Sequence, residues 1–181
     1  MKAHGADAVP CLLPFDSLWR LNPELRSFSI VAYKRNPFTR IVSCWLNKIA
    51  DVAHFNPRFG HRHPGLRPAM SFAEFVEWLN GPEGTDDKAD LHWRSQHLLL
   101  ERATEVRAFE DLPDSVAILG IKPRDLPHRN RHAEAAEIAG LDSRPLLDWY
   151  DAGSIELVRR RYAEDLSKLG YDLPEGLRAV V

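Results

Sequence analysis

A sharp junction between a predicted strand and a predicted helix near residue 36 constrains the fold more than any other feature. Residues 27–33 are rich in strand-forming types and partly alternate between polar and apolar. Asn36 is a favoured helix N-cap, and Pro37 suits the first helical position. Apolar residues then recur at helical spacing, at Phe38, Ile41, Val42, Trp45, Leu46 and Ile49. The junction therefore predicts a strand that turns directly into an amphipathic helix.

Similar patterns predict further elements along the chain. Ser71 and Glu74 form a capping-box pattern, so we expect a helix to begin at residue 71 and stop before Gly81. Two basic stretches that contain proline, 54–69 and 122–132, are expected to be loops. The remaining expected elements are a helix over 90–102, a strand over 105–109, helical turns over 115–119 and 146–150, and a last helix over 154–169. Strands that alternate with helices favour an α/β fold, with a parallel sheet flanked by helices.

Length and composition are those of one globular domain. The 181 residues are 44% hydrophobic and 28% charged, which excludes a disordered chain, a collagen and a coiled-coil rod. We assign 1–24 to an irregular N-terminal segment, 25–175 to the domain and 176–181 to a tail. The net charge of −2 argues against nucleic acid as a partner. Because no apolar run approaches ~18 residues and no signal peptide is evident, the sequence predicts no membrane span and a cytoplasmic location.

The junction also carries the residues that best suggest chemistry. A strand end followed by a helix start offers backbone N–H groups and the positive end of the helix dipole, which favour an anion. Arg35 stands at the strand end and can bind a phosphate with two parallel hydrogen bonds. Ser43 lies about two turns into the helix, with Arg40 and Asn47 on the same side. The alternative is an ordinary solvated junction in which Asn36 and Pro37 only cap the helix.

The segment Arg35-Asn36-Pro37-Phe38-Thr39-Arg40-Ile41-Val42-Ser43 resembles the 3′-phosphate-binding motif of sulfotransferases, and the chain is similar to family-2 sulfotransferases in particular. Further similar segments follow in family order, so that the resemblance spans residues 28–171. They are 71–75, Asp90-Leu91-His92-Trp93-Arg94-Ser95-Gln96, Arg107-Ala108-Phe109-Glu110-Asp111-Leu112, Leu126-Pro127-His128-Arg129-Asn130, and 162–171 with its Tyr-x-x-Asp-Leu and Leu-Gly-Tyr. Ser95 stands where the family pattern prefers proline.

This resemblance implies a nucleotide-kinase-like (P-loop-type) fold and a specific chemistry. The sulfuryl donor would be 3′-phosphoadenosine 5′-phosphosulfate, with Arg35 and Ser43 binding its 3′-phosphate. The acceptor would be a hydroxyl or amine of a carbohydrate-like or other small hydroxyl compound. His92 is the candidate catalytic base, tuned by Asp90. In the family, the base varies between histidine and glutamate. The alternative is that His92 packs or caps a helix.

One part of the family pattern has no counterpart in the sequence. The family's upstream strand–loop–helix, which holds the 5′-phosphosulfate, is not found before Arg35. We therefore expect a sheet that is incomplete at the N-terminus, whose uncovered apolar surface would favour self-association. The alternative function is a catalytically inactive, truncated sulfotransferase-like module that binds a nucleotide or another protein.

Several other residues invite a functional interpretation and have an ordinary alternative. The cationic loop 54–69 could receive an anionic acceptor or could be simply solvated. His61 and His63 lack the further ligands of a known metal spacing, so no metal site is predicted. Residues 159–161, three arginines, are expected on a charged outer face. Cys11 and Cys44 are expected to be reduced thiols, with Cys44 inert.

Overall fold

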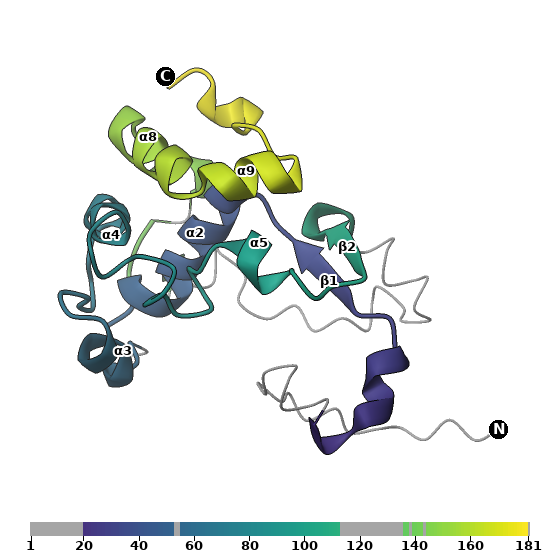
Figure 1. The fold of residues 1–181 in the computed structure, drawn as a ribbon. Coiled ribbons are helices and arrows are strands. Elements are labelled where there is room, and N and C mark those ends of the chain that lie inside the picture. Colours follow the sequence, from purple (N-terminus) through teal and green to yellow (C-terminus); the bar gives the residue numbers. More distant parts are fainter. Residues whose placement is uncertain (1–19, 53–54, 113–135, 138, 143, 181) are drawn as a thin grey trace.

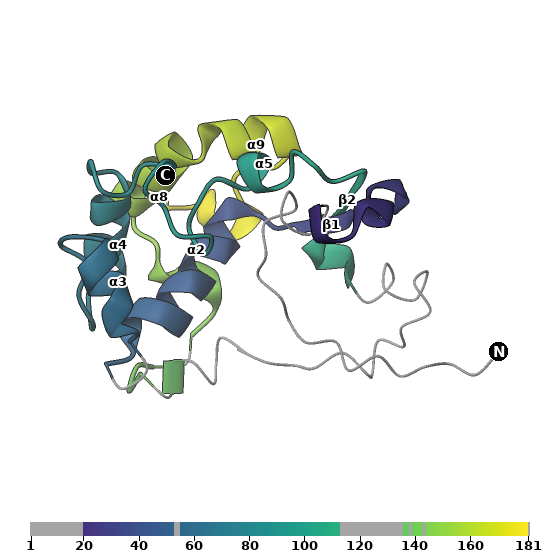
Figure 2. The same cartoon turned by 60° about the horizontal axis from the view of Figure 1, so that its bottom comes forward.

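The computed structural model describes residues 20–52, 55–112, 136–137, 139–142 and 144–180. In the described part, two parallel strands lie at one side of the molecule and helices α3 and α4 at the other, with α2 between them (Figures 1 and 2). The fold is therefore a mixed α/β arrangement with a small parallel sheet. The predicted segments 115–119, 122–132 and 126–130 lie outside the described residues.

The two strands are β1 (Val31–Lys34) and β2 (Glu105–Ala108). Their parallel register runs from Val31 opposite Glu105 to Lys34 opposite Ala108. Thr104 extends the pairing, because its hydroxyl accepts from the Ile30 amide at 2.8 Å. The first strand is shorter than the predicted 27–33. Residues Pro23–Ser27 form a 3-10 helix, and the Ser27 hydroxyl donates to the Glu24 carbonyl within it.

The predicted helix after the junction is confirmed. Helix α2 (Pro37–Trp45) begins where expected, with the Asn36 side chain accepting from the Phe38 amide at 3.0 Å. A π-helical turn, Leu46–Ala50, continues it. Its apolar stripe is buried as the spacing predicts, with Phe38, Ile41, Val42 and Ile49 fully inaccessible. Because a short helix is marginal alone in water, this burial is what stabilises α2.

The second helix predicted from a capping signal is also confirmed. Helix α4 (Phe72–Leu79) begins after Ser71, whose hydroxyl accepts from the Glu74 amide while the Glu74 carboxylate accepts from the Ser71 amide. Its buried residues pack against α2 and α8 (Ala152–Arg161). Trp45 of α2 contacts Phe72 of α4, with their ring centroids 5.5 Å apart, and donates to the Met70 carbonyl at 2.7 Å. The core thus lies between these three helices.

Two predictions of local structure are wrong in extent. The expected loop 54–69 contains helix α3 (Pro57–Arg62), which starts with the same Asn-Pro signal as α2: Asn56 accepts from the Arg58 amide at 3.0 Å. The expected helix 90–102 is reduced to α5 (Gln96–Leu99). The residues before α5 form turns because the Asp90 carboxylate accepts the His92 amide, a local bond that competes with helix formation.

The C-terminal part also differs from expectation. The single helix predicted over 154–169 is two helices, α8 and α9 (Ala163–Leu169), separated at the buried Tyr162. The Tyr162 hydroxyl donates to the Trp93 carbonyl at 2.6 Å. Helix α8 starts earlier than predicted, with Asp151 as its N-cap, and Gly170 ends α9 with a left-handed φ of 66°. Leu177, in the segment assigned to a tail, is only 1% exposed and extends the packed domain.

The three consecutive arginines of α8 do not all lie on an outer face. Arg159 is exposed and pairs with Glu156, as expected of a solvated face. Arg161 is instead only 11% exposed at its side chain and donates to Asp86 and to the Gly84 carbonyl. Arg161 follows the buried Ser154 and Val158 at helical spacing, so it lies on the packed face of α8. The prediction of a charged outer face is therefore wrong for Arg161.

Three short 3-10 helices complete the described elements: Phe109–Asp111, Leu146–Trp149 and Glu175–Leu177. The second of these confirms the helical turn expected over 146–150 and packs on α2, where Trp149 contacts Trp45 at 4.8 Å between ring centroids. Within the described residues, none of the helices combines the length and apolar character that crossing a bilayer requires.

Candidate active site

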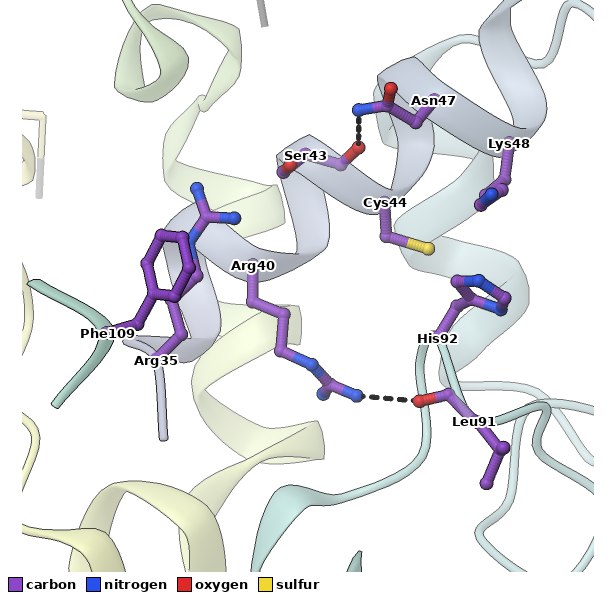
Figure 3. A pocket seen from close by; sticks show the side chains of 9 residues that line it. All are labelled: Arg35, Arg40, Ser43, Cys44, Asn47, Lys48, Leu91, His92 and Phe109. Atoms are coloured by element: carbon purple, nitrogen blue, oxygen red, sulfur yellow. Dashed lines mark hydrogen bonds between the residues drawn. The ribbon is translucent and has the colours of Figure 1, made fainter. Parts of the chain in front are cut away.

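A pocket of about 430 Å³ opens along α2, and three elements contribute its walls (Figure 3). Helix α2 and its π-helical extension form one wall, the turn before α5 forms another, and the residue after β2 closes one end. The lining residues are Arg35, Arg40, Ser43, Cys44, Asn47, Lys48, Leu91, His92 and Phe109. Three of these are cationic at neutral pH, and none of the described lining residues is acidic. The pocket therefore suits an anionic ligand.

Arg35 directly follows the carboxyl end of β1 and is one of the two residues between this strand and α2. Its guanidinium carbon lies 5.2 Å from the centroid of the Phe109 ring, and its Nε donates to the Thr39 hydroxyl at 3.2 Å. Burial lowers the pKa of Arg35, whereas the nearby Glu110 carboxylate raises it. A guanidinium remains charged through shifts of this kind. Arg35 thus presents a partly desolvated, oriented cation to the pocket.

Ser43 faces the same end of the pocket from the second turn of α2. Figure 3 shows its side chain and the Arg35 guanidinium directed toward one another across the α2 surface. The Ser43 carbonyl accepts from the Asn47 side-chain amide at 2.8 Å, which keeps Asn47 on this face. Arg35 and Ser43 therefore line the same pocket, one from a strand end and the other from a helix face.

Arg40 connects α2 to the turn that carries His92. Its Nη2 donates to the Leu91 carbonyl at 3.0 Å. Its Nη1 is buried, and no described residue accepts a hydrogen bond from it. An unpaired buried donor of this kind is costly.

His92 lies at the opposite end of the pocket from Phe109, and its orientation is set by Asp90. Its Nδ1 lies 2.5 Å from Asp90 Oδ1, and the same oxygen accepts the His92 amide at 3.1 Å. Burial alone would raise the pKa of Asp90, but the hydrogen bonds from His92 outweigh it and lower that pKa. A carboxylate at Nδ1 favours the tautomer in which Nε2 can accept a proton. The His92 side chain is 45% exposed and lines the pocket.

Cys44 lines the pocket, but its environment disfavours the reactive thiolate form. It is 7% exposed, and burial raises the pKa of its thiol to about 12. Since the thiolate is the reactive form, Cys44 is inert near neutral pH, as the sequence predicted. Cys11 lies outside the described residues.

Among the described residues of the basic stretch 54–69, none lines this pocket. His63 is 5% exposed and packs against Trp93, with ring centroids 4.9 Å apart, and burial lowers its pKa. It is therefore a neutral core residue. In the described part of the chain, no group of three or more His, Cys, Asp or Glu side chains is arranged to hold a metal ion.

Three lining residues, Lys48, Leu91 and Phe109, were not singled out by the sequence analysis. Lys48 could have been found from spacing, because Arg40, Cys44 and Lys48 recur every four residues along one helical face. Phe109 could not be found in this way. It reaches Arg35 only because the parallel register brings Lys34 opposite Ala108, so that the next residue of each strand lies at the same sheet edge.

The fold and the pocket together define an α/β protein with a cationic site between a strand end and a helix. A model of the sulfotransferase family matches residues 14–172 of the chain. The match covers most of the sequence, so the protein belongs to the family-2 sulfotransferases. Comparisons with curated proteins and with solved structures find no match.

Proposed function

We propose that the chain transfers a sulfuryl group from 3′-phosphoadenosine 5′-phosphosulfate to a hydroxyl or amine of a carbohydrate-like acceptor. The observation that supports this proposal is the convergence of Arg35, Ser43 and His92 on one pocket, although they come from different parts of the fold. Arg35 and Ser43 hold the 3′-phosphate of the donor, and His92 serves the acceptor.

The two ends of the pocket suit these two tasks. At one end, the Arg35 guanidinium offers parallel N–H donors and Ser43 offers a hydroxyl, which is the donor set that a phosphate prefers. At the other end, His92 Nε2 takes the proton of the acceptor group as its oxygen or nitrogen bonds to sulfur. The donor supplies the sulfuryl group, and its sulfur–oxygen bond to the 5′-phosphate breaks in the same step. Asp90 keeps the imidazole in the tautomer that this step requires.

Calorimetric titration with 3′-phosphoadenosine 5′-phosphate, the desulfated donor, tests the phosphate assignment. Adenosine 5′-phosphate, which lacks the 3′-phosphate, is the matched ligand. We expect the wild type to prefer the 3′-phosphorylated nucleotide, and Arg35→Ala to bind it about 10- to 100-fold more weakly, since a hydrogen bond to a charged group contributes about 1.5–3 kcal/mol. Arg58→Ala, at an exposed arginine of α3 outside the pocket, is the control.

A folded wild-type chain that binds both nucleotides equally would contradict the assignment. Sulfuryl transfer to a panel of glycosides then tests turnover. Specific binding without transfer to any acceptor would support the alternative function, a sulfotransferase-like module that binds the nucleotide and does not catalyse.

A further inference from the structure

The backbone of Arg35 is held by a side chain from a distant part of the sequence. The side-chain amide of Gln96 makes two hydrogen bonds to this backbone. The Arg35 N–H donates to Gln96 Oε1 at 2.9 Å, and Gln96 Nε2 donates to the Arg35 carbonyl at 2.7 Å. The strand register ends at Lys34 opposite Ala108, one residue before Arg35. Gln96 therefore satisfies both backbone groups of a residue that lies beyond the sheet pairing, much as a neighbouring strand would.

Gln96 is in turn fixed by Asp165, a fully buried carboxylate of α9. Asp165 Oδ2 accepts a hydrogen bond from the backbone amide of Gln96 at 2.7 Å, and Oδ1 accepts one from the backbone amide of His97 at 2.8 Å. His97 Nδ1 lies 2.7 Å from the same oxygen. These amides open helix α5, whose N-cap Ser95 makes no side-chain capping bond. Asp165 thus caps α5 from another helix and satisfies N–H groups that would otherwise be buried without a partner.

The contacts form a continuous path from α9 through α5 to the candidate phosphate end of the pocket. Asp165 holds the backbone of Gln96, and the Gln96 side chain holds the backbone of Arg35. Separately, Thr39 and Phe109 restrain the Arg35 side chain. An arginine fixed at both its backbone and its side chain loses little freedom when it binds a ligand, so more of the contact energy appears as affinity.

We infer that Gln96 and Asp165 are positioning residues that aim Arg35, and that they set the preference of the site for a nucleotide bearing a 3′-phosphate. This inference rests on the proposed function. Neither residue lines the pocket, so both act through Arg35 rather than by touching the ligand. A purely structural role would lower stability without changing which nucleotide the site prefers.

The test compares Gln96→Met with Gln96→Glu and with Tyr162→Phe. Methionine has a similar length and removes both hydrogen bonds to Arg35, whereas glutamate keeps an acceptor for the Arg35 amide. Tyr162→Phe is the matched control, because it removes one buried hydrogen bond, to the Trp93 carbonyl, and leaves Arg35 untouched. Affinities for 3′-phosphoadenosine 5′-phosphate and adenosine 5′-phosphate are measured by calorimetry, and folding is checked by urea unfolding.

The quantity that decides is the ratio of the two affinities. We expect Gln96→Met to lower this ratio about tenfold, the equivalent of about 1.4 kcal/mol at the 3′-phosphate. Gln96→Glu should lower it by less, and Tyr162→Phe should leave it unchanged despite a similar loss of stability. In the Arg35→Ala background, Gln96→Met should have no further effect on the ratio, because the aimed side chain is gone.

An unchanged ratio in folded Gln96→Met, or an equal fall in Tyr162→Phe, would overturn the inference. If Gln96→Met does not fold, the ratio in Gln96→Glu decides in its place. A wild type that shows no preference for the 3′-phosphorylated nucleotide would instead overturn the proposed function, and with it the assignment on which this inference rests.

Discussion

Replacing Asp86 with asparagine tests the charged cluster that holds the turn before α5 against α8. Each carboxylate oxygen accepts from both Ser95 and Arg161: Oδ1 from the Ser95 amide and Arg161 Nη2, each at 2.8 Å, and Oδ2 from the Ser95 hydroxyl at 2.8 Å and Arg161 Nη1 at 3.2 Å. In either orientation, an asparagine side chain would place an N–H group opposite an arginine N–H group. The substitution therefore removes the charge and leaves donors facing one another.

The size of the effect follows from the pKa of Asp86. Burial alone would raise it, but hydrogen bonds from Arg161 and Ser95 outweigh burial and lower the pKa from 3.8 to about 2. By linkage, a depression of this size corresponds to about 2.4 kcal/mol at neutral pH. The side chain is 28% exposed, so solvent screening reduces the expected contribution to about 1–2 kcal/mol. Because the folded-state pKa is depressed, the contribution is fully present above pH 3.8 and is lost as the pH falls through 2.

Urea unfolding at pH 7 and pH 3, followed by tryptophan fluorescence, measures this contribution. We expect Asp86→Asn to lose about 1–2 kcal/mol of unfolding free energy at pH 7 and about half as much at pH 3. Asp87→Asn, at the neighbouring exposed aspartate, is the control and should change little. Equal stabilities of the wild type and Asp86→Asn at pH 7, or a loss of the same size at both pH values, would refute the reasoning.

Three further predictions concern the pocket and the loop beside it. Cys44, whose burial raises its thiol pKa to about 12, should resist iodoacetamide at pH 8 in the folded protein and react once urea unfolds it; rapid labelling of the native state would contradict this. Gly84→Ala should lower unfolding free energy by about 1–3 kcal/mol, because an added Cβ would overlap the Leu79 carbonyl group; an unchanged urea midpoint would show that the loop yields. Asp90→Asn should reduce sulfuryl transfer about 10²-fold or more without weakening nucleotide binding, because His92 loses the partner that fixes its tautomer; a parallel loss of nucleotide affinity would indicate a role in folding the pocket instead.

The parts of the fold that local signals specify could be predicted from the sequence. The Asn-Pro pair and the apolar stripe located α2, and the Ser71 and Glu74 pattern located α4. Both signals act within one helical turn, so no knowledge of the rest of the chain is needed. The same reasoning predicted that Arg35 and Ser43 lie near one another at the junction, and both line the pocket.

The parts that depend on contacts distant in sequence could not be predicted. No glycine or proline marks the break between α8 and α9, which coincides with the burial of Tyr162 beneath Trp93. Likewise, Gln96 reaches Arg35 only because Asp165 holds the start of α5 against α9. Propensity and periodicity describe neighbours along the chain, whereas these positions are set by packing and hydrogen bonds across it.

The parallel pairing of β1 and β2 joins segments 74 residues apart in sequence. Arg35 and Phe109 directly follow the paired strands. Their end of the pocket therefore forms only after the chain between the two strands has closed into a loop. An unfolded chain therefore offers a ligand no partial site, and binding adds in full to the stability of the folded state. A ligand at about 100 times its Kd would contribute about 2.7 kcal/mol. Thermal melting of the whole domain would thus report occupancy of the pocket, for any nucleotide or acceptor that enters it.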